Sequence, residues 1–343
     1  MSDGRSRPFL DRLDDAARKL LLSVARPASF AAGGRLVRQG EASRGAYVLR
    51  EGAVEATVLL PGGETLAVAR LQAGDVLGET ALIERGTCTA TVTARTAVEA
   101  FFIEREDFRA LIAQREAAAL SVQHAVTLIL SEKLRVLNGK VLEASKSNES
   151  PPREPAGGLK RSGQPSFDIS AFLPHLPIFE GFEPGDIREI IDAGSLLEVE
   201  RGCVIFRRGE PSTACFIVLR GAVEILGYHA KRAHRMAVLG PGQLLGYMSA
   251  LERAEHGADA LVREDALLLE IPREAFEKLY FGTSPASTRL HRVIQKSLLA
   301  SLGQTNRHLT RLISQARLRG ADKEGDELEK AYGGQIIAAA LGG

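Results

Sequence analysis

The residues best suited to chemistry lie together in one short stretch, GETALIERGTCTATV, which covers residues 78–92. Gly78 lets the backbone turn tightly and approach a ligand closely, because it has no side chain to obstruct either. A short helix opened by Thr80 and Ala81 would aim its first amide N–H groups at an anion. The Glu79 carboxylate can accept a hydrogen bond from a hydroxyl group. The stretch therefore predicts a binding site for a small anionic ligand.

This stretch lies inside a segment that occurs twice in the chain. GEASRGAYVLREGAVEATV begins at Gly40, and GEPSTACFIVLRGAVEILG begins at Gly209. Further along, LQAGDVLGETALIERG from Leu71 matches LGPGQLLGYMSALERA from Leu239. Self-similarity at a fixed period indicates copies of one structural unit. The offset is 169 residues for the first pair of segments and 168 for the second, a step that one residue lost in a hairpin explains. We therefore predict a tandem duplication.

Short apolar and β-branched runs dominate each copy, such as AYVLR, AVEATVLL, TATVTA and VEAFFI in the first. They are separated by glycine-containing turns, a pattern typical of antiparallel strands. Helical spacing appears before the first copy, in FLDRLDDAARKLLLSVA, and again after each copy. We predict an α+β, mainly β protein. Its two tandem, jelly-roll-like antiparallel β-rolls are each flanked by N-terminal helices and a long C-terminal helix.

Each long C-terminal helix is expected to carry an apolar seam with alternating spacings of three and four residues. The first seam consists of Leu130, Leu134, Leu137 and Val141. The second consists of Ile294, Leu298, Leu302, Thr305, Leu309, Leu312 and Ala316. Two packings are open: the closing helices join two chains into a homodimer, or each seam packs back on its own roll.

The repeat divides the chain into four parts. The first roll with its closing helix covers residues 1–144, and the second covers residues 169–320. Residues 145–168 are rich in Ser, Pro, Gly and charge, which predicts a flexible linker. Residues 321–343 form a tail that is too short to build a core of its own.

The segment from Leu71 to Ala94 resembles the phosphate-binding cassette of the cyclic-nucleotide-binding domain family. That family includes kinase regulatory subunits, nucleotide-gated channels and catabolite-activator-type regulators. The usual cassette reads F-G-E-L-A-L, then a short loop, then R-A/S/T-A-T/S-V. Here Leu77 stands for the Phe, residues 78–82 follow in register, and Thr89-Ala90-Thr91-Val92 match the far end. The resemblance extends over residues 10–142 and 170–318.

The resemblance implies a ligand, cAMP or cGMP, and a role for each cassette residue. Glu79 would bind the ribose 2′-hydroxyl and Thr89 would add a hydroxyl donor. The family's arginine, which neutralises the cyclic phosphate, is replaced by Cys88. Losing such a charge-assisted bond costs about 1.5–3 kcal/mol. The ligand-binding residues expected in the first copy are Gly78, Glu79, Thr80, Ala81, Cys88 and Thr89.

Two residues of the first cassette allow alternative interpretations. Arg85 either substitutes for the missing arginine or is a solvated loop residue. Cys88 either has its pKa lowered by the nearby helix N-terminus, which would make it sensitive to oxidation or alkylation, or is a small buried thiol.

The second cassette departs further from the family pattern. Gly246 is kept, but Tyr247 replaces the glutamate and His256 replaces the arginine. Neither a ribose-binding carboxylate nor a permanently charged phosphate partner is present. We therefore expect a degenerate second site that does not bind a cyclic nucleotide in the family's manner.

Composition narrows the class of protein. A formal net charge of +1 gives no reason to expect binding to nucleic acid or to an anionic membrane. The three cysteines have no CxxC spacing, which fits a reducing compartment. No apolar run approaches the roughly 20 residues of a membrane span, and the N-terminus has no signal-peptide core. We expect a cytoplasmic protein.

Catalytic patterns are missing from the sequence as well. The seven histidines form no HxH pair, and no Ser-His-Asp or paired-carboxylate pattern is visible. We expect no metal, no catalytic residue and no cofactor, and hence no enzyme. After Arg319 only GADKEGDELEKAYGGQIIAAALGG follows, too short for a winged helix-turn-helix, so the effector should be a separate protein.

Two functions fit these observations. The first is a cyclic-nucleotide-binding regulatory or sensor protein that acts on a partner through rearrangement of its closing helix. The second is a degenerate tandem scaffold or interaction protein that no longer binds cyclic nucleotide. Retention of Gly78, Glu79 and Thr89 favours the first, and loss of the cassette arginine from both copies favours the second.

Overall fold

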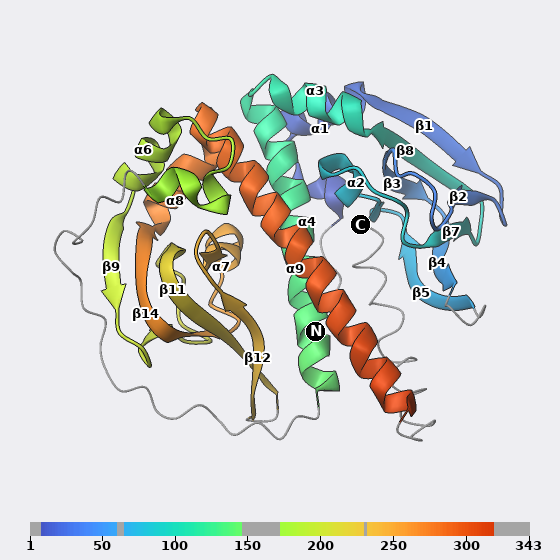
Figure 1. Ribbon diagram of the computed structural model, residues 1–343. Coiled ribbons are helices and arrows are strands. Elements are labelled where there is room, and N and C mark those ends of the chain that lie inside the picture. Colours follow the sequence, from blue (N-terminus) through green and yellow to red (C-terminus); the bar gives the residue numbers. More distant parts are fainter. Residues whose placement is uncertain (1–7, 60–64, 146–171, 230–231, 319–343) are drawn as a thin grey trace. The chain divides into compact units, whose positions relative to one another are not determined.

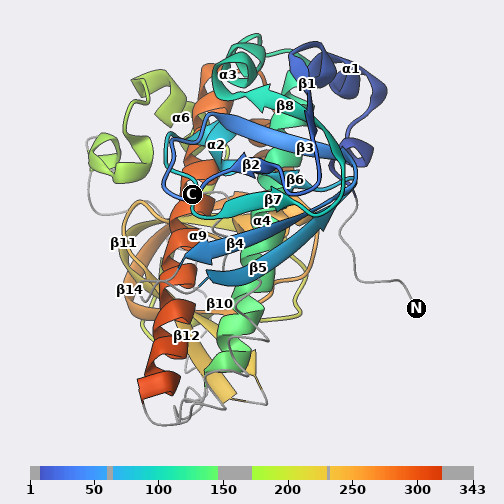
Figure 2. The ribbon, with the colours of Figure 1, turned by 90° about the vertical axis from the view of Figure 1, so that its right-hand side faces the viewer.

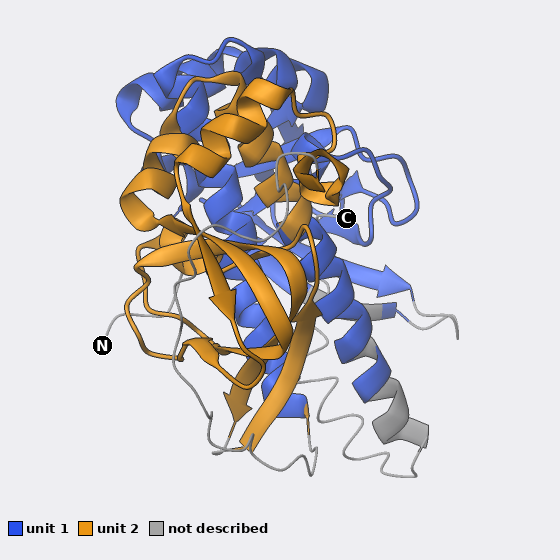
Figure 3. Ribbon diagram, turned by 60° about the vertical axis from the view of Figure 1, so that its left-hand side comes forward, with its two compact units in different colours: residues 1–144, 298–343 blue, residues 145–297 orange. Residues whose placement is uncertain are grey.

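The computed structural model describes residues 8–59, 65–145, 172–229 and 232–318 (Figure 1). The chain divides into two compact units, here called unit 1 (residues 1–144 and 298–343) and unit 2 (residues 145–297) (Figure 3). The predicted linker, apart from its first residue, and the predicted tail lie outside the described residues.

Unit 1 combines two small sheets with helices that follow the predicted order. Its helices are Phe9–Arg12 (η1), Asp15–Ser23 (α1), Thr80–Ile83 (α2), Arg105–Ala113 (α3) and Ala117–Ala144 (α4). Its strands are Ala25–Phe30 (β1), Arg35–Val37 (β2), Gly45–Glu51 (β3), Ala53–Leu59 (β4), Thr65–Gln72 (β5), Val76–Leu77 (β6), Thr91–Ala94 (β7) and Val98–Glu104 (β8).

The strands of unit 1 form two four-stranded antiparallel sheets with the orders β1-β8-β3-β6 and β2-β7-β4-β5 (Figure 2). Alternate residues point into the roll: Val54 and Ala56 of β4 are fully buried, whereas their neighbours are partly exposed. This period of two is what a half-buried strand requires. Helix α1 begins after Asp14, whose carboxylate accepts a hydrogen bond from Ala17 N at 2.8 Å.

Unit 2 repeats this plan with longer strands. Its helices are Leu173–His175 (η2), Pro177–Phe179 (η3), Pro184–Asp192 (α6), Tyr247–Glu252 (α7), Arg273–Phe281 (α8) and the first part of Pro285–Leu318 (α9). Its strands are Ser195–Val199 (β9), Val204–Phe206 (β10), Ala214–His229 (β11), Arg232–Leu239 (β12), Leu244–Leu245 (β13) and Asp259–Pro272 (β14).

The strands of unit 2 form a single six-stranded antiparallel sheet. Its long strand β11 covers the chain that is divided into β3 and β4 in unit 1, and β14 likewise covers the counterparts of β7 and β8. The uninterrupted strands therefore join what are two separate sheets in unit 1. The predicted α+β, mainly β fold with two antiparallel rolls is confirmed.

The seam residues of helix α4 are covered within one chain. Leu130, Leu134, Leu137 and Val141 are all buried, and α4 packs against α1 and α3. The part of α9 that belongs to unit 1 also meets α4, since Thr305 Oγ1 donates a hydrogen bond to Asn138 Oδ1 at 3.2 Å. These apolar faces need no second chain to cover them. A homodimer through the closing helices stays a prediction.

We predict that Gly78→Ala destabilises unit 1 by about 1–3 kcal/mol, because Gly78 has a left-handed backbone and no room for a Cβ. Its φ is +77°, and a Cβ there would lie 2.8 Å from Gly45 O. Gly139→Ala is the control: nothing lies within 4 Å of a Cβ at this position in α4. That change should stabilise by about 0.5–1 kcal/mol. Urea unfolding measures both, and a neutral Gly78→Ala would contradict the strain.

Candidate functional site

The predicted cassette forms one compact corner of unit 1. Strand β6 pairs with β3 through Leu77 and Tyr47, and the chain then turns at Gly78 into the four-residue helix α2. The Ala81 amide donates to Gly78 O at 3.0 Å, so this predicted donor is already engaged within the turn. Because α2 is a single turn, its amides bond mainly to the carbonyls just before it. The predicted contribution of Ala81 to anion binding would require that bond to open.

Glu79 is the polar centre of this corner. Its side chain is 0% exposed, and Lys133 Nζ of α4 lies 2.6 Å from Oε1. Its second oxygen, Oε2, is buried and has no hydrogen-bond partner. A buried carboxylate is costly unless it is paired, and removing its partner leaves an uncompensated charge. Lys133 therefore pairs with one oxygen of Glu79 and leaves the other acceptor oxygen unused.

Glu132, the residue before Lys133, helps to hold helix α4 beside the cassette. The Arg12 guanidinium donates two hydrogen bonds to the Glu132 carboxylate, at 2.7 Å and 2.9 Å. Paired contacts of this kind fix orientation as well as distance. The position of Lys133 relative to Glu79 thus depends on the N-terminal segment as well as on the packing of α4.

Cys88 and Thr89 lie on the neighbouring loop of the cassette. The backbone of Cys88 donates to Glu41 O and accepts from Gly40 N, both at 2.7 Å. Burial raises the pKa of the Cys88 thiol, and a hydrogen bond with the Ser43 side chain only partly offsets this. The thiol is therefore neutral at physiological pH. Thr89 Oγ1 is buried and has no hydrogen-bond partner.

Two arginines near the cassette have other partners. The exposed Arg85 side chain lies 3.2 Å from Glu106, which agrees with the interpretation of a solvated loop residue. Arg105 is buried and donates to Ala81 O at 2.5 Å and to Ser43 O. It therefore holds α2 against the loop before β3. Arg273, the equivalent residue in unit 2, likewise donates to a backbone carbonyl, that of Ser212. Comparison of the two copies could therefore have identified Arg105 as a structural residue.

Unit 2 keeps the backbone of this site and fills it with different side chains. His256 donates through its amide to Glu210 O at 2.9 Å and accepts from Gly209 N at 2.8 Å, as Cys88 does in unit 1. The His256 ring stacks on Phe206 with centroids 3.7 Å apart. Gly246 has a φ of +76°, and the Tyr247 side chain that follows is buried, which raises its pKa. Side chains therefore occupy the cassette of unit 2, and the degenerate second site stays a prediction.

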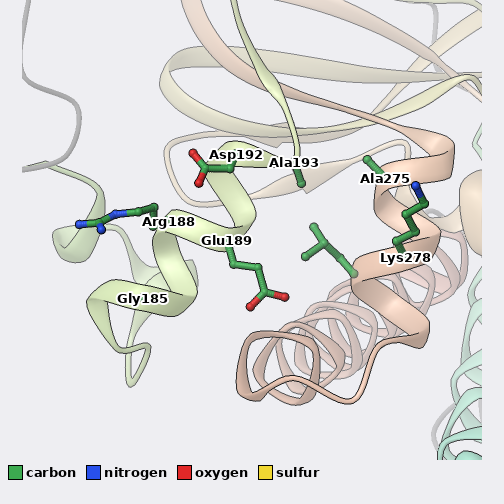
Figure 4. A pocket seen from close by; sticks show the side chains of 8 residues that line it. Gly185, Arg188, Glu189, Asp192, Ala193, Ala275 and Lys278 are labelled. Carbon is green, nitrogen blue, oxygen red and sulfur yellow. The ribbon is translucent and has the colours of Figure 1, made fainter.

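A separate groove of about 600 Å³ lies in unit 2 between α6 and α8 (Figure 4). Arg188, Glu189 and Asp192 come from α6, and Ala275 and Lys278 come from α8. Glu189 already accepts a hydrogen bond from Ser284 Oγ at 2.8 Å. None of the predicted residues of the second cassette, Gly246, Tyr247 and His256, lines this groove.

The described part of the chain shows neither a metal-binding cluster nor a membrane-spanning helix. Within it, no three His, Cys, Asp or Glu side chains are grouped so that they could hold a metal ion. Among the described helices, none combines the length and apolarity that crossing a membrane requires.

Comparison with known proteins agrees with the geometry of the two rolls. The cyclic nucleotide-binding domain family matches residues 27–115 and, separately, residues 196–282. The chain belongs to the cyclic nucleotide-binding domain family. The two matches correspond to the two copies predicted from the sequence repeat, one in each unit.

Two named relatives and one solved structure illustrate what the chain is similar to. A Rhodopseudomonas palustris protein named as a potassium channel is 30% identical over 140 residues, 40% of this chain and 32% of that protein. The cyclic AMP receptor protein of Thermus thermophilus is 33% identical over 101 residues, 29% of this chain and 47% of that protein. The matches thus cover less than half of either relative. The regulatory domain of Toxoplasma gondii protein kinase A with cAMP has a TM-score of 0.32 at 18% identity, covering 86% of this chain and 92% of that one.

We predict that alkylation of Cys88 by iodoacetamide accelerates about tenfold for each pH unit between pH 7 and pH 9, without a plateau. A raised pKa keeps the thiol protonated across this range, so the reactive thiolate fraction follows the pH. Peptide mass spectrometry would measure the rate, and the buried Cys203 serves as a slow internal control. A plateau below pH 8 would show a lowered pKa and revive the redox interpretation.

Proposed function

We propose that unit 1 binds a 3′,5′-cyclic nucleotide, cAMP or cGMP, and that the protein is a regulatory sensor. The observation that carries the proposal is the unused Oε2 of the fully buried Glu79. Buried polar atoms are nearly always hydrogen-bonded, and those that are not need an explanation. A ribose hydroxyl is a donor of the right kind for this oxygen. The unpartnered Thr89 Oγ1 on the adjacent loop adds a second group for the ligand.

The affinity should be lower than a complete cassette would give. Cys88 supplies a neutral thiol where the family has a charged arginine, and the Ala81 amide is engaged within its own turn. A missing charge-assisted bond of about 1.5–3 kcal/mol corresponds to roughly 10- to 100-fold in affinity. The ligand would thus be a weakly bound signal, released as its concentration falls.

The signal would pass through helix α4. Lys133 joins α4 to Glu79 at 2.6 Å, so a ligand that hydrogen-bonds Glu79 changes the electrostatic environment of the helix directly. A ligand shifts a conformational equilibrium only by its differential affinity for the two states. In this proposal the two states differ in how closely α4 lies against the cassette, and a separate effector protein reads the difference.

Catalysis, cellular location, the effector and the role of unit 2 complete the proposed function. We assign no catalytic role to the chain, and we place it in the cytoplasm, where its free cysteines would stay reduced. The relatives carry different names, a putative potassium channel protein and a cyclic AMP receptor protein, and we assign no particular effector. Unit 2 would be a structural partner, because Tyr247 and the His256–Phe206 stack fill its cassette.

Isothermal titration of the full chain with cAMP and with cGMP tests the proposal. We expect one bound nucleotide per chain and saturation below about 1 mM ligand, which corresponds to at least 4 kcal/mol of binding free energy. Glu79→Gln should weaken binding by about tenfold or more, because a charged acceptor is lost. Tyr247→Phe, at the matching position of unit 2, is the control and should bind as the wild type does.

The same titration distinguishes the sensor from the alternative, a scaffold protein. A scaffold that no longer binds nucleotide would give no heat with either ligand at millimolar concentration, and this result would refute the sensor. The loss of both cassette arginines and the filled cassette of unit 2 favour the scaffold. The unused Glu79 oxygen favours the sensor, because a site that had only to pack would not need a buried carboxylate.

A further inference from the structure

We propose that Lys133 supplies the cation for the ligand's phosphate that the cassette of unit 1 lacks in its own sequence. The inference rests on the proposed function, since it names the residue that recognises the charged part of the nucleotide. It assigns a binding role to a helix residue that lies 54 positions from Glu79 in the sequence.

Arg85, Arg105 and Lys133 are positively charged side chains near the cassette. Arg85 forms an ion pair with Glu106 on the surface. The guanidinium of Arg105 is committed to the carbonyls of Ala81 and Ser43, which hold the cassette together. Lys133 differs from both, because its ammonium group lies directly beside the carboxylate that is expected to bind the ribose. The geometry therefore points to Lys133 as the phosphate partner.

The two members of this ion pair differ in exposure. The Lys133 side chain is 23% exposed, whereas that of Glu79 is 0% exposed. Lys133 is therefore the member of the pair that solvent contacts. Attraction between opposite charges is stronger at such a partly desolvated site than in bulk water. Lys133 thus favours anionic ligands and draws them towards Glu79.

The bonding capacity of the pair allows both contacts to coexist. An ammonium group has several N–H donors, and one of them is used on Glu79 Oε1. In a 3′,5′-cyclic nucleotide the phosphate ring is fused to the ribose beside the 2′-hydroxyl. The 2′-hydroxyl can therefore donate to Glu79 Oε2 while a phosphate oxygen accepts from Lys133 Nζ. The buried carboxylate and the partly buried ammonium group both stay paired throughout, which avoids the cost of an isolated ion.

Because the cation comes from α4, the closing helix would itself recognise the phosphate. In an arrangement where the cation belongs to the cassette, the helix responds only indirectly. Here a single side chain connects the ligand's charge, the ribose-binding carboxylate and the helix.

Two ligands and two variants of Lys133 test the assignment in the full-length chain. Binding of cAMP and of adenosine, which has the 2′-hydroxyl but no phosphate, is compared by titration. We expect Lys133→Met to weaken cAMP binding at least tenfold more than adenosine binding, because both ligands lose the support that Lys133 gives to Glu79, but only cAMP also loses a partner for its phosphate. Lys133→Arg should retain most of the cAMP affinity. Lys140→Met, a second half-buried lysine of α4, is the matched control and should bind as the wild type does.

Circular dichroism and thermal unfolding first establish that each variant is folded. If Lys133→Met does not fold, Lys133→Arg keeps the test informative. Equal losses for cAMP and adenosine would overturn the assignment, because Lys133 would then act only by holding Glu79. A gain in cAMP affinity would also overturn it, since Lys133 would then exclude the ligand. If the wild-type chain binds neither ligand, it is the proposed function that fails. If it binds cAMP and Lys133→Met binds equally well, only the role of Lys133 fails.

Discussion

The central constraint in unit 1 is that a fully buried carboxylate must be paired. Glu79 satisfies it through Lys133 at 2.6 Å, and this requirement connects the cassette to the closing helix. The Arg12–Glu132 pair then connects the same helix turn to the N-terminal segment. The cassette, helix α4 and the N-terminal segment are thus connected by two ion pairs, Glu79–Lys133 and Glu132–Arg12. In the proposed sensor, a ligand bound to Glu79 would alter its ion pair with Lys133 and, through it, the packing of α4.

The two copies share the backbone of the cassette and differ in its side chains. In both units the loop residue at the family's arginine position makes the same pair of backbone hydrogen bonds, as Cys88 and as His256. The glycines before both cassette helices share the left-handed conformation. The difference lies in the side chains: a charged, half-satisfied carboxylate in unit 1, and a buried tyrosine with a stacked histidine in unit 2. In our account only unit 1 keeps a binding function.

Local patterns in the sequence were sufficient for the fold and for the cassette positions. Strands such as β4 follow from alternating burial, and the repeat located Gly78 and Gly246 at equivalent turns. Lys133 could not be predicted this way, because its contact with Glu79 depends on how α4 packs on the roll. The same limit applies to the seam at Leu130 and Leu134: spacing indicates that a face is covered, but not by what.

A double-mutant cycle on the unfolding free energy tests the Glu79–Lys133 interaction most directly. Lys133→Met alone leaves a buried unpaired carboxylate and should destabilise the protein by about 3 kcal/mol. Adding Glu79→Gln to Lys133→Met should restore much of that loss, with a coupling energy above about 1 kcal/mol. Circular dichroism would first verify that all three variants fold. Additive effects of the two substitutions would contradict the account, because the buried charge would then not depend on Lys133.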